Sequence, residues 1–206
     1  MSSGDGYDAA RMGGDTTFLR RGGLQAYLVA AFSLAYAVVY LGFVRTDPTN
    51  ATASALAWVL ITAGALSASI ATAAVGAYIG GPQGTFLAAF GVGYSLLSAA
   101  HGAFAAIGDA QGFADLDLSP TDPRGFATFG LAGLWLLVAG LELRGRAGLK
   151  PLYARIAIAG GIDLILLFAA TALGSTPLIL VTGGLASVVF GPIFWAMTGR
   201  LLTAQG

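Results

Sequence analysis

Six long apolar segments, separated by short polar stretches, constrain this chain more than any other feature of its sequence. An α-helix needs about 20 residues to cross the ~30 Å hydrocarbon core of a bilayer, and each segment is close to that length. Lipid offers backbone amides no hydrogen-bond partner, so such segments fold as helices. The sequence therefore predicts an all-α fold, a polytopic membrane bundle of six transmembrane helices at residues 24–44, 54–79, 85–107, 126–143, 152–173 and 177–202.

Composition agrees with a membrane environment. Of the 206 residues, 56% are hydrophobic and only 10% are charged, whereas soluble domains carry about 25% charged residues. We expect a single transmembrane domain at 24–203, preceded by a polar tail at 1–23 and containing an acidic external loop at 108–125. One Lys beside abundant Ala and Gly is typical of a GC-rich prokaryotic genome. We therefore expect a multi-pass protein of a prokaryotic cell membrane.

The distribution of basic residues predicts the orientation of the bundle. Cytoplasmic loops carry an excess of Arg and Lys. With the N-terminus inside, only Arg45 and Arg124 fall outside, and the acidic loop also lies outside. The sequence therefore places both termini in the cytoplasm, together with Arg11, Arg20, Arg21, Arg144, Arg146, Lys150, Arg155 and Arg200.

The first apolar segment has two interpretations. Arg20 and Arg21 precede it, and Ala35-Tyr36-Ala37 lies downstream, as in a cleaved signal peptide. The apolar run continues unbroken to Val44, however. We interpret it as a retained first span.

Asp163 is the first candidate for a functional residue. It lies about eleven residues into the fifth segment, close to the bilayer midplane at a rise of ~1.5 Å per residue. A carboxylate at that depth is costly unless it is paired, hydrated or protonated. Two hypotheses stay open: a proton- or cation-responsive group that faces a polar interior, or a protonated Asp bonded to a neighbour. Its depth suggests Tyr94, Ser95 or Ser98 as that neighbour.

A polar series on the third segment is the second candidate. Tyr94, Ser98 and His101 are spaced by four and three residues, so they share one helix face. The single His can gate protons, ligate a haem or chlorin, or bond a backbone carbonyl. Tyr36 on the first segment shares a face with Ser33 and Tyr40 and is a further candidate for the polar interior. Tyr40 can equally belong to the aromatic belt at the outer interface.

Two other patterns concern helix packing and bending. Small residues recur every four positions on the second segment, which permits close helix contact within the chain or between copies. On the sixth segment Gly191-Pro192 predicts a kink or hinge, because proline removes a helical hydrogen bond. The small-residue series comprises Gly64, Ala68, Thr72, Gly76 and Gly80.

The sequence lacks the motifs of the common catalytic and nucleotide-binding sites. There is no Walker loop, His-Glu-x-x-His or Gly-x-Ser-x-Gly pattern. The chain has no Cys and one His, so we expect no metal site and no enzyme activity. No basic stripe indicates nucleic acid, and no cofactor is indicated.

Two functions fit these observations. The first is a small-solute or ion permease or channel, with Asp163 as a titratable group at the midplane and the 94/98/101 series along the path. The second is a non-catalytic accessory subunit of a larger membrane complex, for which the small-residue face would provide contacts. The expected partners are the lipid bilayer and either a second copy or a membrane-complex protein.

Overall fold

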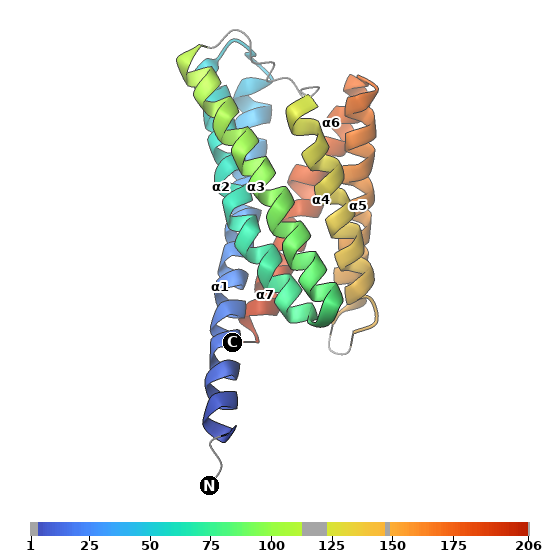
Figure 1. Ribbon diagram of the computed structural model, residues 1–206. Helices are drawn as coiled ribbons and strands as arrows, with labels where there is room; N and C mark the ends of the chain where they lie inside the picture. The colour runs from blue at the N-terminus through green and yellow to red at the C-terminus, as the bar shows by residue number, and fades with distance from the viewer. Residues whose placement is uncertain (1–3, 113–122, 147–148, 206) are drawn as a thin grey trace.

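The structure is a computed structural model that describes residues 4–112, 123–146 and 149–205, with side chains from 16–112, 128–146 and 149–205. The described chain is helical and contains no strand (Figure 1). Its elements are α1 (Gly4–Val39), the π-helix η1 (Tyr40–Val44), α2 (Ala51–Ile79), α3 (Gly81–Gln111), α4 (Pro123–Leu143), α5 (Pro151–Ala172), α6 (Thr176–Gly184), the π-helix η2 (Leu185–Phe190) and α7 (Gly191–Thr203).

Five helical stretches are long and apolar enough to cross a membrane, and a sixth apolar stretch is shorter. The five are Thr16–Val44, Ala51–Ile79, Gly81–Gln111, Pro151–Ala172 and Thr176–Thr203. The shorter one, Thr128–Leu143, belongs to α4. The helical bundle with several apolar helices follows the prediction, while the count of six spans and the cytoplasmic termini stay predictions.

The ends of two elements differ from the expected boundaries. α1 begins at Gly4, so part of the expected polar tail is a continuation of the first helix. α3 continues to Gln111, where Gly112 adopts a left-handed conformation with φ 67°. The helix therefore extends into the region expected to be loop from residue 108, and residues 113–122 of that region lie outside the described chain.

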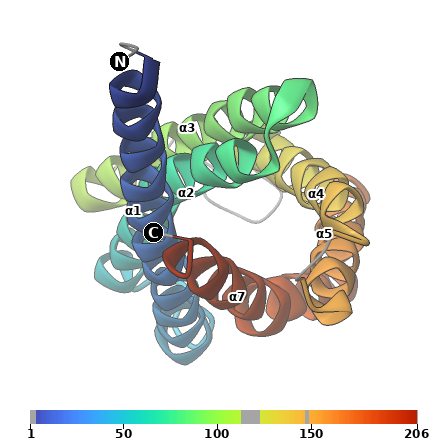
Figure 2. The same cartoon turned by 90° about the horizontal axis from the view of Figure 1, so that it is seen from below.

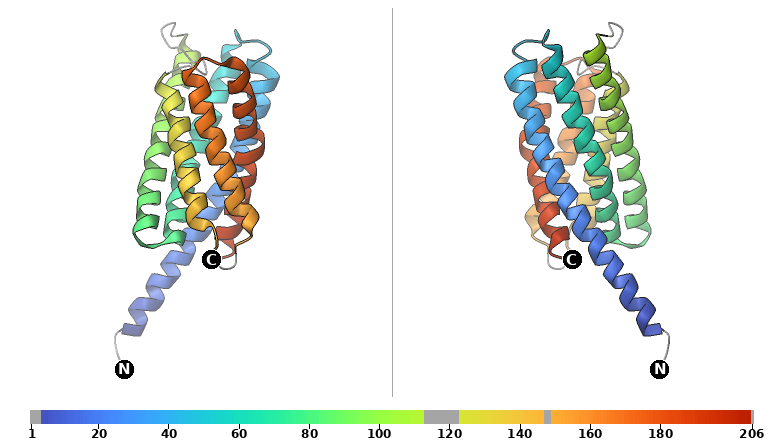
Figure 3. Two further views of the ribbon diagram at one scale, coloured as in Figure 1. Left: turned by 90° about the vertical axis from the view of Figure 1, so that its right-hand side faces the viewer. Right: turned by 90° about the vertical axis from the view of Figure 1, so that its left-hand side faces the viewer.

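The helices stand side by side in a ring. Successive helices from α1 to α6 are neighbours, and α7 packs back against α1 and closes the ring. Figure 2 shows this arrangement along the bundle axis, and Figure 1 shows that α1 begins and α7 ends at the same end of the bundle. The first turns of α1 project beyond the other helices (Figure 3).

Close packing depends on residues without large side chains. A Cβ on Gly76 would collide with the backbone of Gly84 on α3, and a Cβ on Gly22 would collide with Ala74. A Cβ on Gly133 would lie 2.8 Å from the carbonyl oxygen of Gly161, which shows how tightly α4 and α5 approach. Close backbone approach of this kind is typical of helices in membranes.

The four-residue series on α2 is used mainly inside the chain. Ala68 is 6% exposed and Thr72 is fully buried, and Gly64 lies against Phe32 of α1. Gly80 instead forms the turn between α2 and α3 with φ 70°, and nothing lies within 4 Å of its Cβ position. The small residues therefore serve packing between α1, α2 and α3 within one chain.

The sixth span contains a π-helix where the sequence predicted a kink. The N–H of Gly191 donates to the carbonyl of Ala186, five residues earlier, and Pro192 has no N–H to donate. Neither residue can therefore serve the carbonyl of Ser187. The Ser33 hydroxyl of α1 donates to that carbonyl at 3.0 Å, so a side chain from another helix replaces the missing backbone bond.

Candidate functional site

A cavity of about 230 Å³ lies inside the ring of helices. Residues from α1, α2, α3, α4, α5, η2 and α7 line it. Its lining residues are Val29, Ser33, Ile61, Gly64, Ala65, Ala68, Tyr94, Ser98, Ala132, Trp135, Leu136, Gly160, Leu164, Ala186, Ser187, Phe190, Gly191, Phe194 and Trp195. The cavity thus joins parts of the chain that are far apart in sequence.

Aromatic rings form one wall of the cavity. Trp135 of α4 stacks on Trp195 of α7 with ring centroids 5.9 Å apart and planes 13° apart. Tyr94 lies 6.0 Å from Trp135, and Phe194 lies 5.0 Å from Trp195. Such pairs stabilise one another beyond the area they bury, and apart from the Tyr94 hydroxyl this wall is largely apolar.

Hydrogen bonds fix the aromatic wall from behind. The indole N–H of Trp135, 1% exposed, donates to the carbonyl of Leu87 at 2.8 Å. The Thr198 hydroxyl donates to the Phe194 carbonyl at 2.9 Å, so the Tyr153 hydroxyl donates to Thr198 at 2.7 Å. Tyr153 also stacks on Phe194 at 5.4 Å. These buried bonds orient two of the rings that face the cavity.

The polar groups of the cavity are few and uncharged. Ser33, Tyr94, Ser98 and Ser187 supply the side-chain hydroxyls among the lining residues, and no lining residue is charged. Transfer of an ion into such surroundings without a partner is unfavourable. An engineered apolar cavity of about 150 Å³ holds benzene, so this cavity has room for a somewhat larger uncharged molecule.

Two members of the 94/98/101 series line the cavity and one does not. Tyr94 and Ser98 are lining residues. The ring of His101 makes an edge contact with Trp58 of α2, with centroids 5.3 Å apart. His101 therefore belongs to the α2–α3 contact.

Of Tyr36 and the predicted hinge residues Gly191 and Pro192, only Gly191 lines the cavity. Tyr36 stacks on Tyr40 at 5.6 Å and does not line the cavity. One turn earlier on α1, Ser33 does line it. Gly191 lines the cavity and Pro192 is buried next to it.

Asp163 is buried and is not among the residues that line the cavity. It is 6% exposed, and its Oδ2 atom has no hydrogen-bond partner among the described residues. Ser95, one of its expected partners, is fully buried with a hydroxyl that also has no partner there. Within the described chain Ser95 therefore does not satisfy this carboxyl.

Contacts on either side place Asp163 level with η2. Phe190 Cβ lies 3.0 Å from the Cβ position of Gly160, and Leu167 Cδ1 lies 3.8 Å from that of Gly183. These contacts bracket Asp163 on α5 and η2 on the sixth span. Because Gly160 and Leu164 line the cavity, Asp163 is one residue away from a lining position.

Several residues of the site were not singled out from the sequence. Trp135, Trp195, Phe194 and Tyr153 form the aromatic wall and its support. Aromatic residues with a polar atom usually collect at the membrane interfaces. The position of Trp135 well inside a predicted span was the available signal that it packs in the interior.

Nothing in the described chain forms a metal centre, since no three His, Asp or Glu side chains gather there. No protein-family model, curated protein or solved structure matches the chain. The fold and the site together define a helical-bundle protein with several apolar helices, the architecture of multi-pass membrane proteins.

Proposed function

We propose that this chain is a multi-pass permease of a prokaryotic cell membrane for small, uncharged and largely apolar solutes. The central cavity is the observation that supports the proposal, because residues of α1 to α5, η2 and α7 line it and none contributes a charge. Under this proposal the chain is a transporter and not an enzyme.

The position of the cavity favours a transport role. Transporters often bind solutes near the middle of the membrane, next to helices that are interrupted there. Here the sixth span is interrupted by η2, whose Ala186, Ser187 and Phe190 line the cavity. A change in the conformation of η2 would change the wall of the binding site.

Asp163 provides a group through which protons can act on η2. It is buried level with η2 and has a carboxyl oxygen without a partner within the described chain. In our proposal its protonation alters the packing of α5 against the sixth span and so couples proton and solute movement.

The test is solute flux in proteoliposomes. A panel of uncharged solutes of increasing size, from glycerol to phenol, would be compared with charged solutes such as acetate and choline. Ser98→Phe places a ring in the cavity and is expected to abolish uptake of the uncharged solutes. Leu97→Phe is the matched control, because Leu97 is 56% exposed on the outer surface of the same helix.

The outcomes separate the parts of the proposal. Loss of uptake in Ser98→Phe with normal uptake in Leu97→Phe supports the cavity as the solute path. Uptake by Asp163→Asn that no longer depends on protons supports the coupling role of Asp163. Equal uptake in both Phe variants excludes the cavity as the path. No uptake by a well-folded wild-type protein overturns the permease function.

The extension of α1 supports a second candidate, the accessory subunit. The first turns of this helix project past the bundle (Figure 3) and have no other described helix of the chain beside them. If the protein is a subunit, deletion of residues 1–14 should release a co-purifying membrane partner while the bundle stays folded. The small-residue series on α2 does not support this function, because most of it is packed inside the chain.

A further inference from the structure

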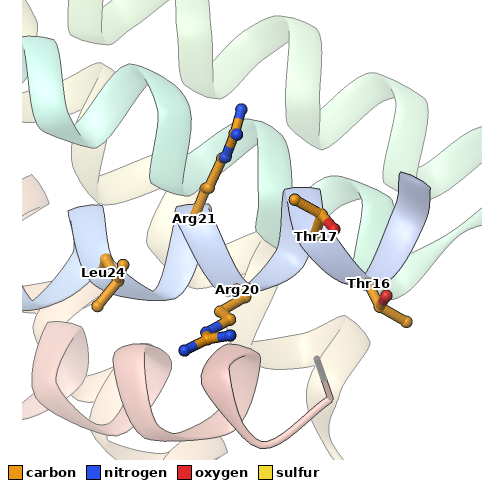
Figure 4. Close-up of a pocket in the computed structure, with 5 residues that line it drawn as sticks. All are labelled: Thr16, Thr17, Arg20, Arg21 and Leu24. Atoms are coloured by element: carbon orange, nitrogen blue, oxygen red, sulfur yellow. The ribbon is translucent and has the colours of Figure 1, made fainter. Parts of the chain in front are cut away.

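A basic pocket lies on the outer face of α1, apart from the central cavity. It has a volume of about 270 Å³ and is lined by Thr16, Thr17, Arg20, Arg21 and Leu24 (Figure 4). All five side chains are exposed. Their spacing of three and four residues places them on one helix face.

The opposite face of α1 fixes the orientation of this pocket. A Cβ on Gly22 would collide with Ala74 of α2, and a Cβ on Gly23 would lie 2.9 Å from the Gly199 carbonyl oxygen of α7. Both glycines are buried in these contacts. The helix therefore cannot turn its arginines into the bundle, and they stay on the outer surface.

The pocket lies close to the end of the bundle where α2 ends and α7 ends. Gly22 is level with Ala74, about one and a half turns from the end of α2 at Ile79. Gly23 also lies against Thr203, the last residue of α7. The pocket occupies the first turns of the candidate span Thr16–Val44, where polar and basic residues give way to the apolar residues that follow. If the bundle spans a bilayer, we expect lipid headgroups to meet the hydrocarbon core at about this level.

The charges of the pocket are not neutralised within the described chain. Neither Arg20 nor Arg21 forms an ion pair there, and none of the described residues that line the pocket is acidic. Figure 4 shows the Arg20 and Arg21 side chains extending to the two sides of α1. Arginine binds phosphate oxygens through several N–H groups at once.

An apolar surface continues from the pocket toward the middle of the span. Leu24, Tyr27 and Leu28 follow on the same side of α1 and are 54%, 41% and 44% exposed. An acyl chain can lie along this surface while its headgroup stays between the arginines. A free phosphate ion would use only the first part of the site.

From this combination of a basic pocket and an adjoining apolar face, we propose that Arg20 and Arg21 bind the headgroup of an anionic phospholipid whose acyl chain packs along Leu24 and Leu28. Charge attraction between basic residues next to a membrane span and anionic lipids is the physical basis. The site is independent of the transport proposal, because none of its residues lines the central cavity.

Native mass spectrometry of the purified protein tests the proposal. The protein would be equilibrated with equal amounts of phosphatidylglycerol and phosphatidylcholine, and bound lipids would be counted for each variant. We expect the wild type to retain phosphatidylglycerol at least fivefold over phosphatidylcholine, and the double variant Arg20→Gln, Arg21→Gln to lose this preference. Arg45→Gln is the control, because Arg45 is an exposed arginine after η1, at the opposite end of the first span.

Two further measurements make the result decisive. Glycerol phosphate, which has the headgroup charge without acyl chains, should not displace the bound lipid even at millimolar concentration. Thermal unfolding in detergent should show that the double variant folds and that added phosphatidylglycerol raises the Tm of the wild type alone. Equal lipid retention by the wild type and the double variant, or loss of preference in Arg45→Gln as well, would overturn the proposal.

Discussion

Asp163 is the residue for which the structure adds most to the sequence. The sequence placed it deep within an apolar segment and left open whether it faces a polar interior or packs against a neighbour. In the structure Asp163 is 6% exposed. The expected hydroxyl partner Ser95 does not satisfy it, and its Oδ2 atom has no partner in the described chain. A buried polar atom without a partner costs about 1–3 kcal/mol.

This arrangement predicts the effect of removing the carboxyl. Asp163→Leu should raise the free energy of unfolding by about 1–3 kcal/mol, because an unsatisfied polar group is replaced by an apolar one of similar branched shape. Thermal unfolding followed by circular dichroism would measure the change, and Asp163→Asn, which stays polar, should give a smaller one. If Asp163→Leu instead lowers stability, the carboxyl has a stabilising partner. Flux measurements on the same variants report separately on its role in transport.

Among the elements, η2 shows how a local defect is compensated by another helix. Pro192 deprives the Ser187 carbonyl of a backbone donor, and the Ser33 hydroxyl of α1 takes the place of that donor. The sequence indicated an interruption at Gly191-Pro192. It did not indicate that a serine 154 positions before Ser187 would satisfy it, since that pairing exists only because α7 closes the ring against α1.

A double-mutant cycle tests this compensation. Ser33→Ala alone should destabilise the protein by about 0.5–1.5 kcal/mol, the usual value of one hydrogen bond. In a Pro192→Ala background the same change should cost much less, because the substituted residue supplies the missing N–H, and the difference is the coupling between the two positions. Chemical or thermal unfolding of the four proteins measures it. Equal costs in both backgrounds would contradict the explanation, and Ser98→Ala serves as a control for loss of a cavity hydroxyl on another helix.

At the scale of the whole molecule, the ring places both ends of the described bundle together. α1 begins and α7 ends on the same side (Figure 1), as the predicted six crossings would require. The bias of arginine toward that side predicts that it faces the cytoplasm. The fourth crossing is the shortest one in the predicted topology, because the apolar part of α4 that is described is Thr128–Leu143.

The absence of cysteine in the sequence makes this topology directly measurable. Single variants Thr49→Cys, in the turn between η1 and α2, and Gln205→Cys, after α7, carry one thiol each, and both positions are exposed. In intact cells a membrane-impermeant maleimide should label position 49, and position 205 only after permeabilisation. Labelling of both positions from the same side would exclude the predicted topology, and the reverse pattern would invert it.

What the sequence determined by itself was the bundle of several apolar helices and the position of Asp163 well inside one of them. Both can be read from the hydrophobicity along the chain. A long apolar run must place its backbone in a helix when it lies in lipid, and this requirement does not depend on which other helices are its neighbours. The cavity, its aromatic wall of Trp135 and Trp195, and the partner of Ser187 were decided by the tertiary structure. These features depend on which helices become neighbours and at which heights, and that outcome is set by the close packing of small residues such as Gly22, Gly76 and Gly161 across the whole ring.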